Sequence, residues 1–389
     1  MPKVFVTDAQ MRSSLAVIRS LGKKGITVTA GEETIFATGF FSKYCSKKLI
    51  YPSPKKYEDE FIACIINHLK NNKYDALIPV ADACLKPIID NAEEISQYAK
   101  IGLPPKEIFL KGYDKGITLQ IAKEFDIPCP QTFFLNCLDD ISRIDNKLTY
   151  PLIIKPRISS GSRGMVVCAN KSELINQFKQ LSSVYNNLLA QEYIPNGGEI
   201  GVYTLVNYNS EPRALSVQQR IRSYPISGGP STLRQTIKHP SSDQAIDFAF
   251  KLLKAMKWQG IAMVEFRIDP RDGIPKLMEV NPRFWGSLQL SILSGIDFPY
   301  LLYRLLMDGD VVNPEFDYKE GVKCRWLLPG EILWYMNSPD KINNFKELLN
   351  FSIPDDIISS DDPGPTFGFF AATMRYLFDK EMWKFVLRR

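Results

Sequence analysis

The chain has 389 residues, of which 45% are hydrophobic and 23% are charged. This length suffices for two or three domains that each bury a core, and the composition excludes a disordered or fibrous protein. The net charge of +5 is spread along the chain without a basic block, which argues against nucleic acid as a partner.

Seven scattered cysteines and two histidines narrow the chemistry further. The cysteines never show CxxC spacing, so neither a disulfide framework nor a zinc site is expected, and they suit a reducing compartment. The first residues lack the features of a signal peptide, and no apolar run reaches membrane-spanning length. We therefore expect a cytoplasmic protein whose chemistry depends on Lys, Arg, Glu and Asn.

The first hundred residues alternate between strand-like and helical patterns. These patterns follow one another at 3–7, 12–21, 26–30, 57–71, 76–80 and 84–91. Their order predicts an open parallel α/β domain over residues 1–104. The turn after the first strand lacks the GxGxxG glycines, which disfavours a nicotinamide enzyme. Asp82 follows the third strand and is either a substrate contact or a helix N-cap.

A linker at 103–105 introduces a second region with helical spacing at 106–125. Strands are predicted at 152–155, 164–168, 188–194, 201–206, 214–220, 261–268 and 276–280, with helices at 171–181 and 243–256. We expect an α+β domain over residues 105–310, with a small mobile lobe at about 125–190. Residues 311–389 then form a C-terminal extension.

The most specific motif is a set of polar residues on two late strands. Glu279, Asn281 and Arg283 alternate along one strand, so their side chains share a face. Glu265 on the neighbouring strand adds a second carboxylate, and two carboxylates with an amide oxygen are hard ligands that suit Mg²⁺. The alternative is a pair of strand acids satisfied by Arg267 and Arg283, although burying the whole set favours a polar ligand.

A second motif combines a lysine with a loop of small residues. Lys155 ends a buried strand, and residues 159–165 follow it. Such a lysine can reach phosphates while the amides of the loop fold over them. An ordinary hairpin is the alternative, and the Walker A pattern is absent from the sequence.

These motifs together resemble ATP-grasp enzymes, particularly the branch similar to the large subunit of carbamoyl phosphate synthetase, biotin carboxylase and carboxylate-amine ligases. The resemblance covers about residues 1–310. It implies an ATP-grasp fold preceded by an open parallel, Rossmann-like pre-ATP-grasp domain. It also implies ATP with Mg²⁺ or Mn²⁺ as cofactors, and a reaction in which a small carboxylate is activated as an acyl phosphate and joined to an amine.

The resemblance assigns roles to individual residues. The implied ATP-binding residues are Lys115, Lys155, Ser160, Gly161, Arg163, Gly164, Glu192, Tyr193, Ile194 and Glu199. Within this set the two lysines would contact phosphates, the glycine loop would form a lid, residues 192–194 would face adenine, and Glu199 would hold ribose. The implied metal ligands are Glu265, Glu279 and Asn281, and the implied catalytic residues are Arg283, Lys155 and Arg220.

The loop at 220–231 lies where relatives place a segment over the reacting groups. Arg220 and Arg222 suit bidentate binding of a carboxylate or phosphate, with solvated strand-edge arginines as the alternative. The implied substrate contacts are Asp82, Arg222, Gly229 and Ser231.

Residues 367–389 are aromatic and basic. They suit an amphipathic helix that either lies on an acidic membrane surface or packs on the protein body. A homodimer is also compatible with this reading. Two further functions stay open: ATP-dependent phosphoryl transfer to a hydroxyl or to bicarbonate, and a non-catalytic nucleotide-binding scaffold, against which a complete metal site argues.

Overall fold

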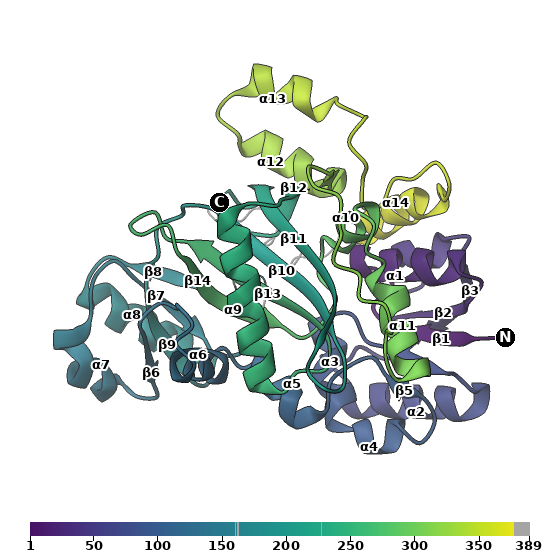
Figure 1. Cartoon of the computed structure of the whole chain (residues 1–389), viewed down its shortest axis with the longest axis horizontal. Helices are drawn as coiled ribbons and strands as arrows, with labels where there is room; N and C mark the ends of the chain where they lie inside the picture. Colours follow the sequence, from purple (N-terminus) through teal and green to yellow (C-terminus); the bar gives the residue numbers. More distant parts are fainter. Residues whose placement is uncertain (160, 162, 227, 377–389) are drawn as a thin grey trace.

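The computed structural model describes residues 1–159, 161, 163–226 and 228–376. Ser160 and the end of the predicted tail helix, residues 377–389, lie outside the described part. Three sheets organise the chain, and Figure 1 shows the parallel sheet and the small lobe on opposite sides of a central antiparallel sheet.

The first sheet is parallel and confirms the predicted α/β domain. Its strands are ordered β3-β2-β1-β4-β5. Their bounds are β1 Lys3–Val6, β2 Thr27–Glu32, β3 Cys45–Ile50, β4 Ala76–Ile78 and β5 Lys100–Ile101, and the helices between them are α1 Arg12–Lys23, α2 Glu58–Asn72, α3 Asp82–Asp90 and α4 Ala92–Ile95. The strand order reverses between β1 and β4, and ligands of open α/β sheets bind at such a point. Asp82 begins α3 at this edge.

The small lobe is a four-stranded antiparallel sheet in the order β6-β9-β7-β8. Its elements are β6 Thr132–Leu135, α7 Leu138–Ile144, β7 Leu152–Pro156, β8 Val166–Cys168, α8 Lys171–Ser182 and β9 Leu188–Glu192. Leu152 and Ile154 pack against the two helices, with Leu174 and Phe178. Because successive strand residues point to opposite faces, Lys155 lies on the face away from these helices.

The central sheet has six strands in the order β14-β13-β10-β11-β12-β15. Its bounds are β10 Glu199–Val206, β11 Pro212–Ser223, β12 Ser231–Thr236, β13 Gly260–Ile268, β14 Pro275–Asn281 and β15 Lys323–Arg325. Helix α9 (Pro240–Met256) lies across one side of this sheet (Figure 1). Val264 and Phe266 are buried in the main hydrophobic core, whereas the intervening Glu265 belongs to the opposite, polar face.

Two predicted segments need correction. The helix expected at 106–125 is two helices, α5 (Lys106–Tyr113) and α6 (Lys115–Glu124). Asp114 separates them because its extended backbone lets its carboxylate accept hydrogen bonds from the amides of Gly116 and Ile117 at the start of α6. The strand expected at 188–194 ends at Glu192, so Tyr193 and Ile194 follow it.

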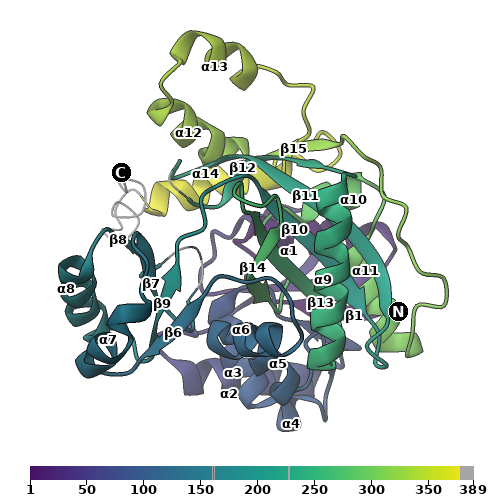
Figure 2. The same cartoon turned by 60° about the vertical axis from the view of Figure 1, so that its left-hand side comes forward.

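The C-terminal extension contributes β15 and further helices. These are α12 Ile332–Asn337, α13 Lys341–Leu348 and α14 Gly364–Tyr376, and the preceding chain carries α10 Leu288–Leu293 and α11 Phe298–Asp308. Figure 2 shows α12 and α13 projecting from the body. Helix α14 packs on the first domain, where a Cβ at Gly368 would lie 2.5 Å from Cδ2 of Phe41.

Helix α14, which contains the described residues of the segment 367–389, therefore lies on the protein body. Membrane contact by residues 367–389 stays a prediction. Within the described ranges, no helix is both long and apolar enough to cross a membrane.

Candidate active site

The three predicted metal ligands converge on the polar face of the central sheet. Glu265 on β13 pairs directly with Glu279 on β14. Nδ2 of Asn281 donates to Oε1 of Glu265 and to Oε1 of Glu279, both at 3.1 Å. Two carboxylates and one amide from neighbouring strands therefore meet at one point, as the alternation along the strands predicts.

Two lysines approach this point from other elements. Lys115, at the start of α6, has its Nζ 3.1 Å from Oε2 of Glu279 and also donates to the carbonyl oxygen of Ser159. Lys155 on β7 is buried. The pKa of Lys155 is lowered to about 8, mainly by burial and also by the charge of Lys115, while Glu279 and Glu265 oppose the shift. Both predicted phosphate lysines thus belong to the carboxylate site.

The two carboxylates differ in their protonation. The pKa of Glu265 is raised to about 7, mainly by burial and also by the neighbouring charge of Glu279. Burial also acts on Glu279, but Lys115 and Lys155 outweigh it and hold the pKa of that carboxyl below its usual range. Lys115 and Lys155 therefore compensate the charge of Glu279, whereas burial disfavours the charge of Glu265.

Arg283 connects this site to the first domain. Its Nε donates to Oδ1 of Asp82 at 2.7 Å, and its Nη2 donates to Oδ1 of Asn281 at 3.3 Å. Burial acts against the charge of Arg283, but the Asp82 carboxylate raises the pKa above its usual value. Asp82 therefore lies at the site through its ion pair with Arg283; direct substrate contact by Asp82 stays a prediction.

Arg220 and Glu199 lie beside the metal ligands. Nη1 of Arg220 is 2.6 Å from Oε2 of Glu199, and its Nη2 is 4.0 Å from Oε2 of Glu265. Nη2 of Arg267 is 2.7 Å from the other oxygen of Glu199. Glu199 is thus shared by two arginines, and its predicted contact with ribose stays a prediction.

The residues expected to face adenine lie at the end of β9. Oε1 of Glu192 is 2.6 Å from Nη2 of Arg271, and Ile194 is buried. Glu192 and Tyr193 line a cavity of about 470 Å³ together with Leu152 and other residues. Leu152 belongs to the helix-covered face of the small sheet, so part of this cavity is lined from the face away from Lys155. The role of this segment in binding a base stays a prediction.

The described residues of the expected lid include two glycines in the left-handed region. Gly161 has φ +62° and Gly164 has φ +71°. A Cβ at Gly164 would also lie 2.9 Å from Cγ of Pro156, so this position requires glycine. Arg163 is exposed. Movement of this loop and its contact with phosphate stay predictions.

The remaining predicted substrate residues lie near the C-terminal extension. Nη1 of Arg222 is 3.0 Å from Oε2 of Glu331, and the guanidinium stacks 4.1 Å from the ring of Trp334. A Cβ at Gly229 would collide with the carbonyl group of Tyr224. Ser231 begins β12. Structural ion pairing therefore occupies Arg222, and its substrate role stays a prediction.

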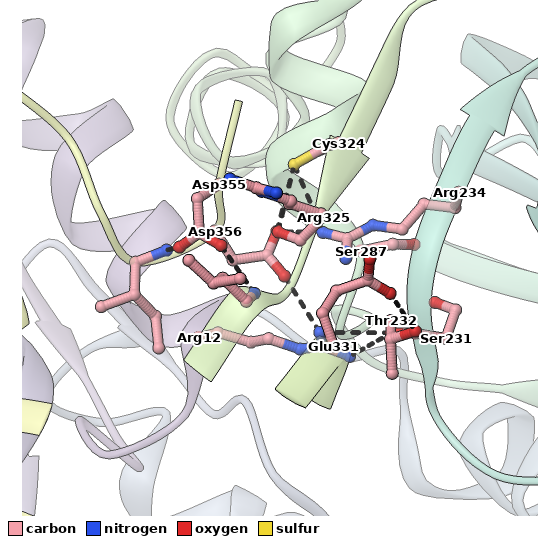
Figure 3. Close-up of polar contacts among 12 residues, drawn as sticks. Arg12, Ser231, Thr232, Arg234, Ser287, Cys324, Arg325, Glu331, Asp355 and Asp356 are labelled. Atoms are coloured by element: carbon pink, nitrogen blue, oxygen red, sulfur yellow. Dashed lines mark hydrogen bonds and ion pairs between the residues drawn. The ribbon is translucent and has the colours of Figure 1, made fainter. Parts of the chain in front are cut away.

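Sequence reasoning missed a buried ionic cluster at this edge of the sheet. Figure 3 shows the Asp356 carboxylate between the guanidinium groups of Arg12 and Arg234. Arg12 comes from the first domain, Arg234 from β12 and Asp356 from the extension. A signal was present in the spacing of Arg12 and Arg19 on one helix, but their partners Asp356 and Asp362 are more than 340 positions away.

A parallel α/β domain, a small four-stranded lobe and a large sheet whose carboxylates are approached by lysines from α6 and β7 together indicate the ATP-grasp fold. The model of a family described as "ATP-grasp in the biosynthetic pathway with Ter operon" matches residues 185–328. Solved structures agree with this fold over about four fifths of the chain. The predicted ATP-grasp fold is therefore confirmed.

Three of these structures illustrate the likeness. Biotin carboxylase from Campylobacter jejuni is 16% identical with a TM-score of 0.70, over 83% of this chain and 74% of that one. L-amino acid ligase from Bacillus licheniformis is 18% identical with a TM-score of 0.62, over 79% and 74%. N5-carboxyaminoimidazole synthetase from Staphylococcus aureus is 15% identical with a TM-score of 0.64, over 81% and 79%.

Proposed function

We propose that the chain is an ATP- and Mg²⁺-dependent ligase that activates a substrate carboxylate as an acyl phosphate and couples it to an amine. The observation that carries this proposal is the convergence of Glu265, Glu279 and Asn281 with Lys115 and Lys155 on one polar face. Carboxylates hold a metal and lysines hold phosphates, and the site joins both kinds of group.

The residues present fit magnesium. The donors are hard oxygen ligands, and burial together with the neighbouring Glu279 raises the pKa of Glu265, an effect that a bound cation would offset. The amide of Asn281 now donates to both carboxylates, so binding a cation requires it to turn its oxygen toward them. When bound, the metal would neutralise phosphate charge and polarise the bond that breaks.

Within the chain itself, the two lysines have complementary tasks. Lys155 projects from the small lobe and Lys115 from helix α6. A triphosphate held by both lysines would therefore draw the small lobe onto the central sheet. The contact of Lys115 with the carbonyl oxygen of Ser159 links this grip to the start of the lid loop. Closing the lobe would exclude water from an acyl phosphate that hydrolyses readily.

The reaction proceeds by two displacements. An oxygen of the substrate carboxylate attacks the γ-phosphorus, the bond to the β-phosphate oxygen breaks, and ADP leaves. The amine nitrogen then attacks the acyl carbon, the bond to the phosphate oxygen breaks, and the nitrogen loses a proton. Arg283, fixed by Asp82, would orient the carboxylate, so catalysis rests on positioning and charge stabilisation.

The similar structures support a ligase over other ATP-dependent activities. One of them is named an L-amino acid ligase, and another is named a synthetase. Within this class of fold, the chemistry that fits paired lysines and a substrate arginine is attack by a carboxylate on ATP. A phosphotransferase would use the same nucleotide groups with a hydroxyl or bicarbonate as the acceptor.

The experiment that tests the proposal is an ADP-release screen over mixed carboxylates and amines, with product mass determined. Hydroxylamine serves as a trap, because it converts an acyl phosphate into a hydroxamate. We expect ADP, a hydroxamate in the trapped reaction, and an amide product with the correct amine. ADP with a phosphorylated product and no hydroxamate would establish phosphoryl transfer instead, and no ADP with any mixture would favour a scaffold.

A further inference from the structure

Helix α14 exposes its large apolar side chains. Phe367, Phe370 and Met374 are 70%, 53% and 63% exposed, and their spacing of three and four residues places them on one face of the helix. Gly368 and Ala372, on another face, are buried. A helix that packs on a protein body usually turns its large apolar residues toward that body. Here the small residues take that place and the large ones are left in contact with solvent.

The first domain continues this apolar surface. Helix α14 packs on the short 3-10 helix η1 (Thr38–Phe41), where a Cβ at Gly368 would lie 2.5 Å from Cδ2 of Phe41. Phe41 is itself exposed, and so are Ile35 and Phe36 in the loop that leads into η1. Neighbouring exposed apolar side chains of this kind mark an interaction surface, unlike single ones scattered over a protein.

Lysines lie at the border of this surface. Nζ of Lys48 on β3 is 5.3 Å from the centre of the Phe41 ring. Asp361, the exposed acid just before α14, lies within 3.1 Å of Nζ of Lys23 and within 2.8 Å of Nζ of Lys43. The negative charge next to the helix is therefore paired, and Lys48 adds a positive one.

The charges around the surface are positive in sum. Glu33, which precedes Ile35, is the other exposed acid at this border, so the three lysines exceed the two acids by one. The sequence 375–389, which follows Met374 directly, contains five basic and two acidic residues. A cationic border opposes contact with a second copy of the same surface and favours an anionic partner.

The helix offers few polar groups to a protein partner. Residues 364–374 include no charged residue, and Oγ1 of Thr373 donates to the carbonyl oxygen of Phe369 at 2.8 Å. Protein interfaces usually carry about one hydrogen bond per 100–200 Å², which a face of Phe and Met cannot supply. The boundary between lipid headgroups and acyl chains accepts such a face without these bonds.

We propose that α14 and η1 form a membrane-docking surface for bilayers that contain anionic lipids. Phe367, Phe370 and Met374 enter the membrane to a depth of about 5–10 Å, as the apolar faces of interfacial helices do. Lys48 lies at the level of the headgroups and attracts their negative charge. The helix lies along the membrane surface, and attachment uses no residue of the proposed ATP site.

Co-sedimentation of the full chain with lipid vesicles tests the apolar part of the surface. We expect binding to vesicles of phosphatidylcholine with phosphatidylserine, and weaker binding to vesicles of phosphatidylcholine alone. Phe367→Gln should weaken binding to the anionic vesicles about tenfold or more, because it removes a buried aromatic ring from the bound state. Ile342→Gln is the control, because Ile342 is an equally exposed apolar residue on another helix, α13. It should bind as wild type does.

A second pair of variants tests the charge at the border. Lys48→Gln should weaken binding to the anionic vesicles about fivefold and leave binding to the neutral ones unchanged. Lys251→Gln is its control, because Lys251 is an exposed lysine on α9. All four variants should keep the wild-type thermal unfolding midpoint, since each substituted side chain is exposed.

The inference is overturned if the full chain does not bind anionic vesicles, if it binds neutral vesicles equally well, or if Phe367→Gln binds as wild type does. Ile342→Gln as weak as Phe367→Gln would also overturn it, because the membrane would then contact α13. A dimer in sedimentation velocity that Phe367→Gln dissociates would assign the surface to a second copy of the chain instead.

Discussion

The two ends of the central sheet treat buried charge in different ways. At β13 and β14 the carboxylates of Glu265 and Glu279 face each other, and the lysines that offset them reach in from separate elements. At the other end Arg222 on β11 and Arg234 on β12 lie within ion pairs, and their partners Glu331 and Asp356 are both 1% exposed. The first end has donors available for a ligand, and the second is held together by its own contacts.

This difference suggests that the β13–β14 end serves the proposed reaction and that the opposite end stabilises the fold. Burial, with the neighbouring charge of Glu279, raises the pKa of Glu265 to about 7, and perturbed carboxyl groups of this kind cluster at functional sites. The ion pairs of Arg12 and Arg19 at the other end join the first domain to the C-terminal extension.

Replacing Glu279 should have the largest effect on activity. Glu279→Gln removes one of two metal carboxylates and the partner of Lys115, so we expect ADP release to fall about 10³-fold. Its thermal unfolding midpoint should stay close to wild type. Glu211→Gln is the control, because Glu211 pairs with Arg213 at a turn and is 55% exposed. Full activity in Glu279→Gln would remove the basis for the metal site.

Replacing Asp356 should have the largest effect on stability. Asp356→Asn leaves Arg12 and Arg234 buried without their shared carboxylate, so we expect a loss of about 3–5 kcal/mol in the free energy of unfolding. Urea denaturation measures it. Asp361→Asn is the control, because its partners Lys23 and Lys43 and Asp361 itself are largely in water, and no measurable change is expected. Equal effects in the two variants would refute the contrast between the ends.

A smaller loss in the free energy of unfolding is expected from removing a single hydrogen bond to Glu331, at the same end of the sheet. Oγ1 of Thr232 donates to Oε1 of Glu331 at 2.6 Å, so Thr232→Val should cost about 1.5–3 kcal/mol. Thr204→Val removes an equally buried hydroxyl that donates to the neutral carbonyl of Ala214, and it should cost about 0.5–1.5 kcal/mol. If Thr204→Val is the more damaging of the two, the charge of Glu331 is not what this edge depends on.

The sequence predicted the first end of the sheet and missed most of the second. Alternation along β14 and the residue types at 265, 279 and 281 were enough to predict that the carboxylates and the amide meet. The two strands that carry them are adjacent in the sequence and pair directly. Asp356 and Glu331 find their partners through tertiary packing, which hydrophobic periodicity does not encode. Both acids lie in the C-terminal extension outside the aromatic and basic segment 367–389, so no predicted element pointed to the partners of Arg12 and Arg222.

Local chemistry also decided the two corrected boundaries. Asp114 divides the expected helix because a carboxylate at this position caps α6, and Arg157 fixes it with contacts of 2.9 and 2.7 Å. The helical spacing at 106–125 alone favoured one continuous helix. The apolar run after β9 continues into Ile194, so its pattern did not reveal where pairing with β7 ends.

The pH dependence of kcat/KM for ATP tests the proposed site at β13 and β14. The metal requires an ionised Glu265, whose pKa is raised to about 7, so kcat/KM for ATP should rise with pH through that value. Phosphate binding requires a charged Lys155, whose pKa is lowered to about 8, so the same quantity should fall above it. Lys155→Arg should abolish the fall while keeping the rise, because a guanidinium stays protonated. A fall that persists in Lys155→Arg would mean that another group titrates there.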